Sequence, residues 1–106
     1  MLPKIYRLDA KDFPGIYKDG RKIRGKYGML VVKESSNPTP QFGFVVSKKI
    51  GNAVQRHRLT RMLRVIFVEI VKELNIQNKN IQYIAFEFCN ESKLLKEDIL
   101  KQMKEI

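Results

Sequence analysis

A helical pattern that begins beside a dense basic run constrains this chain more than any other feature. Gly51 and Asn52 indicate a turn followed by an N-cap, and Asn52 with Gln55 has the spacing of a capping box. Beyond this cap, apolar residues recur every three or four positions, as on the buried face of a helix. They are Leu59, Leu63, Ile66, Ile70 and Leu74. The pattern predicts one continuous helix that ends near Asn75.

Positive charge is concentrated at the start of this helix and just before it. Residues 47–64 contain no acidic residue and six basic ones: Lys48, Lys49, Arg56, Arg58, Arg61 and Arg64. Because a helix turns about 100° per residue, Arg61 and Arg64 fall opposite the apolar stripe, together with His57. Close like charges on a helix repel by on the order of a few tenths of a kcal/mol per pair, whereas ordinary solvated surfaces mix both signs. A polyanion that offsets the repulsion is therefore the favoured partner.

The charge of the whole chain agrees with such a partner. The formal net charge is +10 at pH 7, and all seven arginines lie within residues 1–64. Guanidinium groups bind phosphate through paired hydrogen bonds, whereas a lysine acts as a point charge. The composition therefore favours nucleic acid or an anionic membrane surface, and the arginines favour structured phosphate recognition.

We expect a cytoplasmic protein that does not span a membrane. The longest apolar stretches are far shorter than the roughly 20 residues of a transmembrane helix, and the first four residues lack the apolar core of a signal peptide. The single cysteine, Cys89, excludes an internal disulfide, and a single histidine argues against a zinc site.

Residues 1–106 are expected to form one domain, since the chain is 43% apolar and contains neither a linker nor a repeat. Residues 9–19 have helical character with Gly20 as a stop, and Pro14 moves the expected start toward Asp12. Residues 27–33 and 42–47 are rich in β-forming side chains. A polar segment with two prolines separates them, which indicates a hairpin with a long loop.

The last quarter of the chain predicts one strand and one helix. Residues 81–88 alternate in a manner typical of a strand, and Asn90 or Ser92 can cap the helix that follows. The inward face of this helix is expected to carry Leu95, Ile99, Met103 and Ile106. The expected order is therefore helix, two or three strands, helix, strand and helix.

Aromatic residues in the basic half are open to two interpretations. Phe13, Tyr17 and Tyr27 fit core packing, but they also fit a base-stacking surface for single-stranded RNA. His57 lies between two arginines and has no acidic neighbour, so we expect it to hydrogen-bond or stack rather than act as a general base. The sequence has no phosphate-binding loop, metal-ligand spacing or nucleophile motif, so we expect no catalytic residue and no metal site in the protein.

The run from Phe44 onward, F-V-V-S-K-K-I-G-N-A-V-Q-R-H-R-L-T-R-M-L-R, resembles the signature of the bacterial ribonuclease P protein subunit. In that family the run is S-K-K-x-G-N-A-V-x-R-N-R followed by spaced arginines. The chief departure is His57, which stands where the family usually has Asn. Weaker similarity extends over most of the chain.

The resemblance implies an α+β fold, a single-domain α/β sandwich with the order helix, three strands, helix, strand, helix and a left-handed βαβ crossover. It also implies a protein subunit that joins a catalytic RNA and helps to remove the leader from precursor tRNA. The Mg²⁺ for hydrolysis would be held by the RNA partner, and the protein alone would bind no cofactor and no small-molecule substrate.

Two sets of site residues follow from the resemblance. The residues implied to dock on the catalytic RNA are Lys48, Lys49, Asn52, Arg56, His57, Arg58, Arg61 and Arg64. Those implied to line the leader cleft are Phe13, Tyr17 and Tyr27. The alternative is a ribosomal or other structural RNA-binding protein, which would share the composition without requiring the motif. An autonomous nuclease is disfavoured because no carboxylate cluster is available to hold a metal ion.

Overall fold

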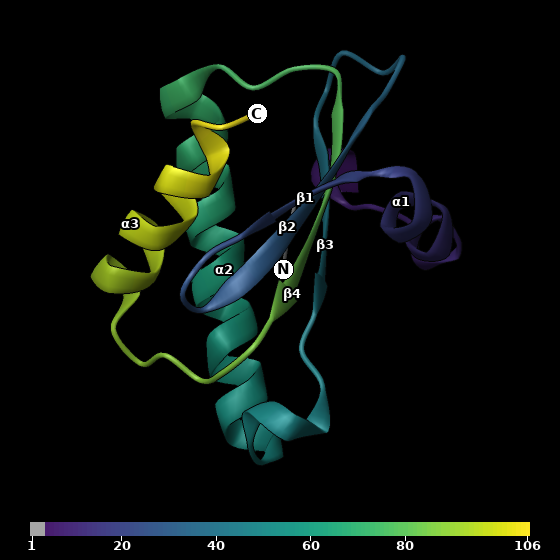
Figure 1. Ribbon diagram of the computed structural model, residues 1–106. Helices are drawn as coiled ribbons and strands as arrows, with labels where there is room; N and C mark the ends of the chain where they lie inside the picture. The colour runs from purple at the N-terminus through teal and green to yellow at the C-terminus, as the bar shows by residue number, and fades with distance from the viewer. Residues whose placement is uncertain (1–3) are drawn as a thin grey trace.

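The computed structural model describes residues 4–106 and contains one four-stranded mixed sheet between two layers of helix (Figure 1). The helices are α1 (Phe13–Asp19), α2 (Ala53–Leu74) and α3 (Ser92–Met103). The strands are β1 (Arg21–Arg24), β2 (Gly28–Glu34), β3 (Gln41–Val45) and β4 (Lys79–Ala85). Short 3-10 turns lie at Lys4–Tyr6, Ala10–Asp12 and Lys48–Ile50. Figure 1 shows α2 and α3 on one side of the sheet and α1 on the other.

The strand order is β1-β2-β4-β3, so the predicted hairpin between residues 27–33 and 42–47 is wrong. β4 lies between the two strands and pairs antiparallel with β2 and parallel with β3; Ile81, for example, is opposite both Val32 and Phe42. The central place suits β4 because Ile81, Gln82 and Tyr83 are all buried. The long polar loop between β2 and β3 spans the position of one strand and so leaves room for β4 between them. Consequently α2 forms the crossover between neighbouring parallel strands.

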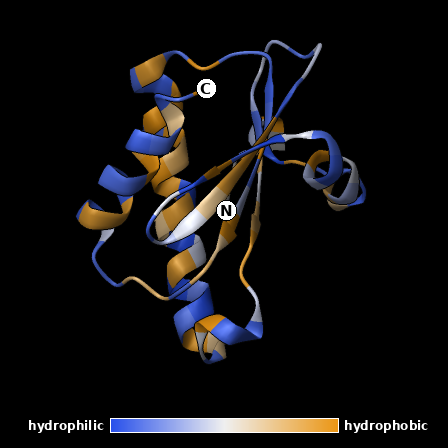
Figure 2. Cartoon of the chain, viewed as in Figure 1, coloured by the Kyte–Doolittle hydropathy of each residue, from blue (hydrophilic) through white to orange (hydrophobic). Residues whose placement is uncertain are grey.

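The main core lies between the sheet and the pair α2 and α3. Four of the five predicted stripe residues on α2 are buried, and Leu74 is half-buried. Phe67, at the centre, packs its ring against Phe42, Phe44 and Tyr83 at centroid distances of 5.3, 5.2 and 5.7 Å. Figure 2 shows the hydrophobic residues gathered along the strands and on α2. This packing fixes α2 against the core from Leu59 to Val71.

A second, smaller core lies under α1 on the opposite face. Leu8 and Ile16 pack there on Met29 and Val31 of β2. The predicted start of α1 is confirmed, because Asp12 is the N-cap and Pro14 lies in the first turn, where its missing N–H costs nothing. Gly20 is the C-cap, as expected.

Near the C-terminal end, three local predictions fail. β4 ends at Ala85, three residues earlier than expected, and the N-cap of α3 is Glu91 rather than Asn90 or Ser92. Ile106 lies beyond α3 and is 36% exposed, whereas the other three predicted inward residues are buried. The strand β1 was not specified by the sequence pattern, because three of its four residues are basic.

Candidate nucleic-acid interface

The start of α2 is fixed by the predicted capping box. The side-chain oxygen of Asn52 accepts a hydrogen bond from Gln55 N at 2.9 Å, and the Gln55 side chain accepts one from Asn52 N at 3.0 Å. Gly51 has φ +152°, and a Cβ there would lie 2.1 Å from Gln55 Oε1, so only glycine fits beside the cap. Asn52, implied to dock RNA, therefore first serves as the cap that orients the basic residues around it.

The basic side chains of the motif form one surface at this end of α2. Lys48, Lys49, His57, Arg58 and Arg61 are exposed, and Arg56 and Arg64 are half-buried. Within residues 4–106, none of the six basic residues of the motif forms an ion pair with a carboxylate. We call these six residues with His57 the basic surface. Its charge is not compensated by any carboxylate of residues 4–106, as the sequence pattern predicts.

Two adjoining cavities connect the basic surface to Phe13 at the start of α1. A cavity of about 220 Å³ is lined by Arg56, His57 and Thr60, and one of about 260 Å³ by Thr60, Arg64 and Phe13. Thr60 belongs to both walls, and Arg7 also lines the second cavity. The basic surface thus continues around the edge strand β3 toward α1. Sequence reasoning missed Thr60 and Arg7 because neither is among the basic residues of the motif.

The structure brings Phe13 and Tyr17 together on α1 but places Tyr27 elsewhere. Phe13 is half-buried over Gly43, where an added Cβ would lie 2.2 Å from the ring. Tyr17 is 48% exposed, and Lys22 Nζ lies 4.6 Å from its ring centroid. Tyr27 packs instead against the main core on the other face, with its N–H donating to Asp98 of α3 at 3.0 Å. Tyr27 lies in the turn before β2. The alternation of side chains between the two faces of a strand therefore does not predict the direction of its ring.

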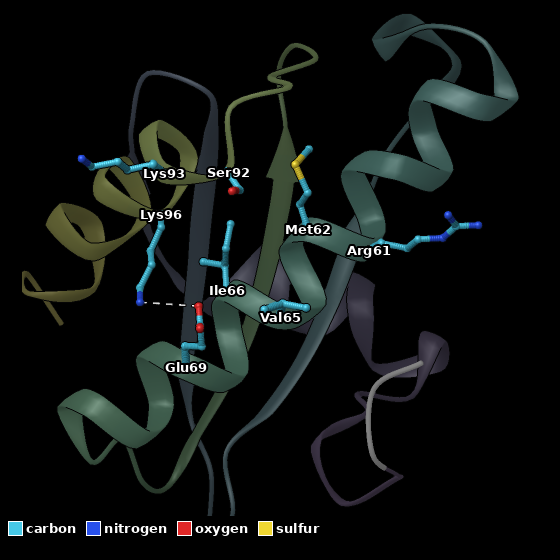
Figure 3. Close-up of a pocket in the computed structure, with 8 residues that line it drawn as sticks. All are labelled: Arg61, Met62, Val65, Ile66, Glu69, Ser92, Lys93 and Lys96. Carbon is cyan, nitrogen blue, oxygen red and sulfur yellow. Dashed lines mark ion pairs between the residues drawn. The ribbon is translucent and has the colours of Figure 1, made fainter.

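The largest of these cavities, about 550 Å³, lies between α2 and α3 (Figure 3). Met62, Val65 and Ile66 give it an apolar wall. Lys96 pairs with Glu73 at 2.8 Å and with Glu69 at 3.5 Å, and the hydrogen bond to Glu73 raises the pKa of Lys96 above its ordinary value. Arg61 extends away from this pair in Figure 3. The charge of Lys96 in this cavity is therefore balanced, unlike that of the basic surface.

Other kinds of site receive no support from the described residues. Within residues 4–106, no three His, Cys, Asp or Glu side chains come together in a way that could hold a metal ion. No helix of this part of the chain is long and apolar enough to cross a membrane.

A family model and individual sequence relatives both point to the family that the basic motif resembles. The family described as Ribonuclease P matches residues 2–105. A ribonuclease P protein component from Microcystis aeruginosa is 35% identical over 96% of this chain and 90% of its own length. Those from Acidothermus cellulolyticus and Syntrophomonas wolfei are 42% and 33% identical over 60% and 76% of this chain. The chain spans 56% and 65% of these two relatives.

Solved structures share the whole fold. The RNase P protein from Thermotoga maritima superimposes with a TM-score of 0.85 at 25% identity, covering 94% of this chain and 96% of its own. An RNase P protein mutant from Staphylococcus aureus gives a TM-score of 0.82 at 27% identity, covering 96% and 88%. Basic motif, fold and relatives all agree, and the chain belongs to the ribonuclease P protein family.

Proposed function

We propose that this chain is the protein subunit of a ribonuclease P and binds both the catalytic RNA and the leader of precursor tRNA. The observation that carries the proposal is the basic surface: six cations without ion pairs to the carboxylates of residues 4–106, held on a capped helix and the turn before it. Rigid, uncompensated positive charge matches a folded RNA, whose phosphates have fixed positions. A cytoplasmic location follows from these partners.

Docking on the catalytic RNA falls to the basic surface. Arg58 and Arg61 are exposed and can reach phosphates through paired hydrogen bonds, while Lys48 and Lys49 act as point charges from the turn before α2. A neutral His57 offers one donor and one acceptor nitrogen, so it can replace a side-chain amide in a single contact.

Leader binding falls to α1. The exposed ring of Tyr17 suits stacking on an unpaired base, and half-buried Phe13 forms an apolar wall beside Arg64. Tyr27 is absent from this assignment because it packs on the opposite face of the sheet.

We assign the hydrolysis to Mg²⁺ held by the catalytic RNA. The six lysine and arginine side chains of the basic surface are cations and repel Mg²⁺, which takes oxygen ligands such as carboxylates and phosphates. The protein's part is then to bind both RNA molecules and to hold the leader in a fixed orientation, which lowers the entropic cost of reaching the cleavage geometry.

A reconstitution experiment tests this function. Precursor tRNA would be incubated with the purified chain, with the catalytic RNA of the same organism, and with both together in Mg²⁺ buffer. We expect no cleavage by the protein alone and faster cleavage, with tighter substrate binding, when protein joins RNA. Cleavage by the protein alone would support an autonomous nuclease. RNA binding without any effect on cleavage would support a structural RNA-binding protein.

A further inference from the structure

The apolar cavity between α2 and α3 begins where the basic surface ends. Arg58, Arg61 and Val65 follow one another on α2 at intervals of three and four residues, so their side chains lie in one row along the helix. Arg61 belongs to the basic surface and also lines the cavity, and Val65 lies about one turn further along the helix, roughly 6 Å away. An RNA that binds Arg61 therefore has this cavity directly beside it.

The wall that α2 gives to the cavity exposes apolar surface to water. Val65 is 60% exposed and Met62 is half-buried, while Ile66 is buried beneath them. The cavity volume of about 550 Å³ lies within the range of roughly 300–1,000 Å³ that is typical of sites for small organic ligands. Because covering apolar surface is favourable, the cavity suits a ligand with a flat apolar group, and one nucleotide is small enough to enter it.

Positive charge stands on both sides of the cavity. Figure 3 shows Arg61 and Lys93 extending from opposite sides, one from α2 and the other from α3. Both side chains are exposed, and within residues 4–106 neither forms an ion pair with a carboxylate. An apolar wall between two such cations fits a ligand that joins an apolar ring to anionic groups, as a nucleotide in an RNA chain does.

The carboxylates near the cavity restrict where a phosphate can lie. Glu69 is four residues beyond Val65 on α2 and pairs with Lys96, which also pairs with Glu73. Two carboxylates around one lysine leave this end of the cavity negative, so it repels phosphate. Ser92, at the other end in Figure 3, adds a hydroxyl that can donate to or accept from the edge of a base. The phosphates of a bound nucleotide therefore belong at the two unpaired cations, and its base belongs on the apolar wall.

We propose that this cavity binds one unpaired nucleotide of the catalytic RNA, with its base on the wall formed by Met62, Val65 and Ile66. The neighbouring phosphates lie at Arg61 and Lys93. The inference rests on the proposed function, because docking of the basic surface brings the RNA to Arg61. RNA loops and bulges can turn an unpaired base outward, and apolar side chains hold such a base as aromatic ones do. A base contact here adds sequence recognition to a surface whose phosphate contacts carry none.

The first test measures the affinity of cavity variants for the catalytic RNA at several salt concentrations. Val65→Asn removes apolar contact without changing the charge, so it should weaken binding about five- to tenfold and leave the log–log salt slope unchanged. Lys93→Ala should weaken binding and also make the slope shallower by about 0.7 to 0.9, because one phosphate contact is lost. Val65→Leu stays apolar and should bind like the unaltered protein. Thermal melting should give the same Tm for Val65→Asn, since Val65 is exposed.

The second test identifies the nucleotide by chemical probing of the catalytic RNA. Dimethyl sulfate and a carbodiimide together modify the pairing edges of all four unpaired bases. We expect the unaltered protein to protect one unpaired base through this cavity. Val65→Asn, added at a saturating concentration, should restore the reactivity of that base and leave protection elsewhere in place.

Leu94→Asn is the matched control, because Leu94 is an exposed apolar residue of α3 that does not line the cavity. It should match the unaltered protein in affinity, salt slope and protection. If the unaltered protein binds the catalytic RNA, but Val65→Asn and Lys93→Ala bind it equally well and no base regains reactivity, the nucleotide site is overturned while docking stands. The apolar wall would then be left for a partner protein. If the unaltered protein does not bind the catalytic RNA, the proposed function fails as well.

Discussion

Replacing Gly43 with alanine would place a methyl group in the space that the ring of Phe13 occupies. The new Cβ would lie 2.2 Å from Phe13 Cζ and 2.3 Å from Cε1. Carbon atoms in contact are about 3.5 Å apart or more, so the ring must move by about 1.3 Å. Overpacking of this kind costs about 1–3 kcal/mol of the free energy of unfolding. For a domain of roughly this size, the expected fall in Tm is about 5 to 20 °C.

Displacement of the Phe13 ring should also affect RNA binding selectively. The ring lines the cavity beside Arg64, so Gly43→Ala should weaken binding of precursor tRNA to the holoenzyme, measured at a temperature where the variant is folded. Affinity for the catalytic RNA should change little, since the start of α2 is fixed by its own capping box. Thermal melting and filter binding measure the two effects separately.

Gly15→Ala is the matched control for this substitution. A Cβ at Gly15 would have no neighbour within 4 Å, and the residue lies inside α1, where alanine favours the helix over glycine by about 0.5–1 kcal/mol. This variant should melt slightly above the unaltered protein. A second control combines Gly43→Ala with Phe13→Leu, which should cost less than the sum of the two single changes. Unaltered melting and precursor binding in Gly43→Ala would refute the contact and the place of Phe13 in the site.

Three further outcomes are expected. Arg61→Ala should make the log–log dependence of RNA affinity on salt shallower, by about 0.7 to 0.9 for each phosphate that is no longer neutralised; an unchanged slope and affinity would remove Arg61 from the interface. His57→Ala should leave the pH dependence of single-turnover cleavage intact with docking saturated, and disappearance of a limb near the pKa of histidine would make His57 catalytic. Tyr17→Ala should weaken precursor tRNA binding about tenfold or more while mature tRNA binding changes little, and Tyr17→Phe should be nearly silent. Equal weakening for both tRNAs with a lowered Tm would assign Tyr17 to the core.

The elements that local sequence determines were predictable. Both ends of α2 follow from Asn52 at its cap and from Asn75, which adopts the left-handed conformation with φ 52°. The part of the basic surface that lies on α2 follows from helical periodicity, because neighbours on a helix are only three or four positions apart. These features depend on contacts within one segment, so their sequence patterns are sufficient.

Contacts between distant segments were not predictable in the same way. β1 has a single apolar residue, Ile23, and it is a strand because it pairs with β2. The place of β4 between β2 and β3 depends on how three strands pack together on one core. The sequence of a single strand does not determine this order. Arg24 and Phe86 meet across the sheet although 62 positions separate them. Their pairing required the register of strands β1, β2 and β4.

β4 lies at the centre of the sheet although it is the second-to-last element along the chain. During synthesis, α2 and the other three strands leave the ribosome first, with no strand between β2 and β3 and no finished sheet beneath the apolar stripe of α2. Incomplete chains of this kind expose apolar surface and unpaired strand edges, which promotes aggregation. A chain shortened just before β4 would keep all six cations of the motif but would lack the scaffold that arranges them. The nascent protein therefore acquires the charge of the basic surface before it acquires the fold that arranges this charge.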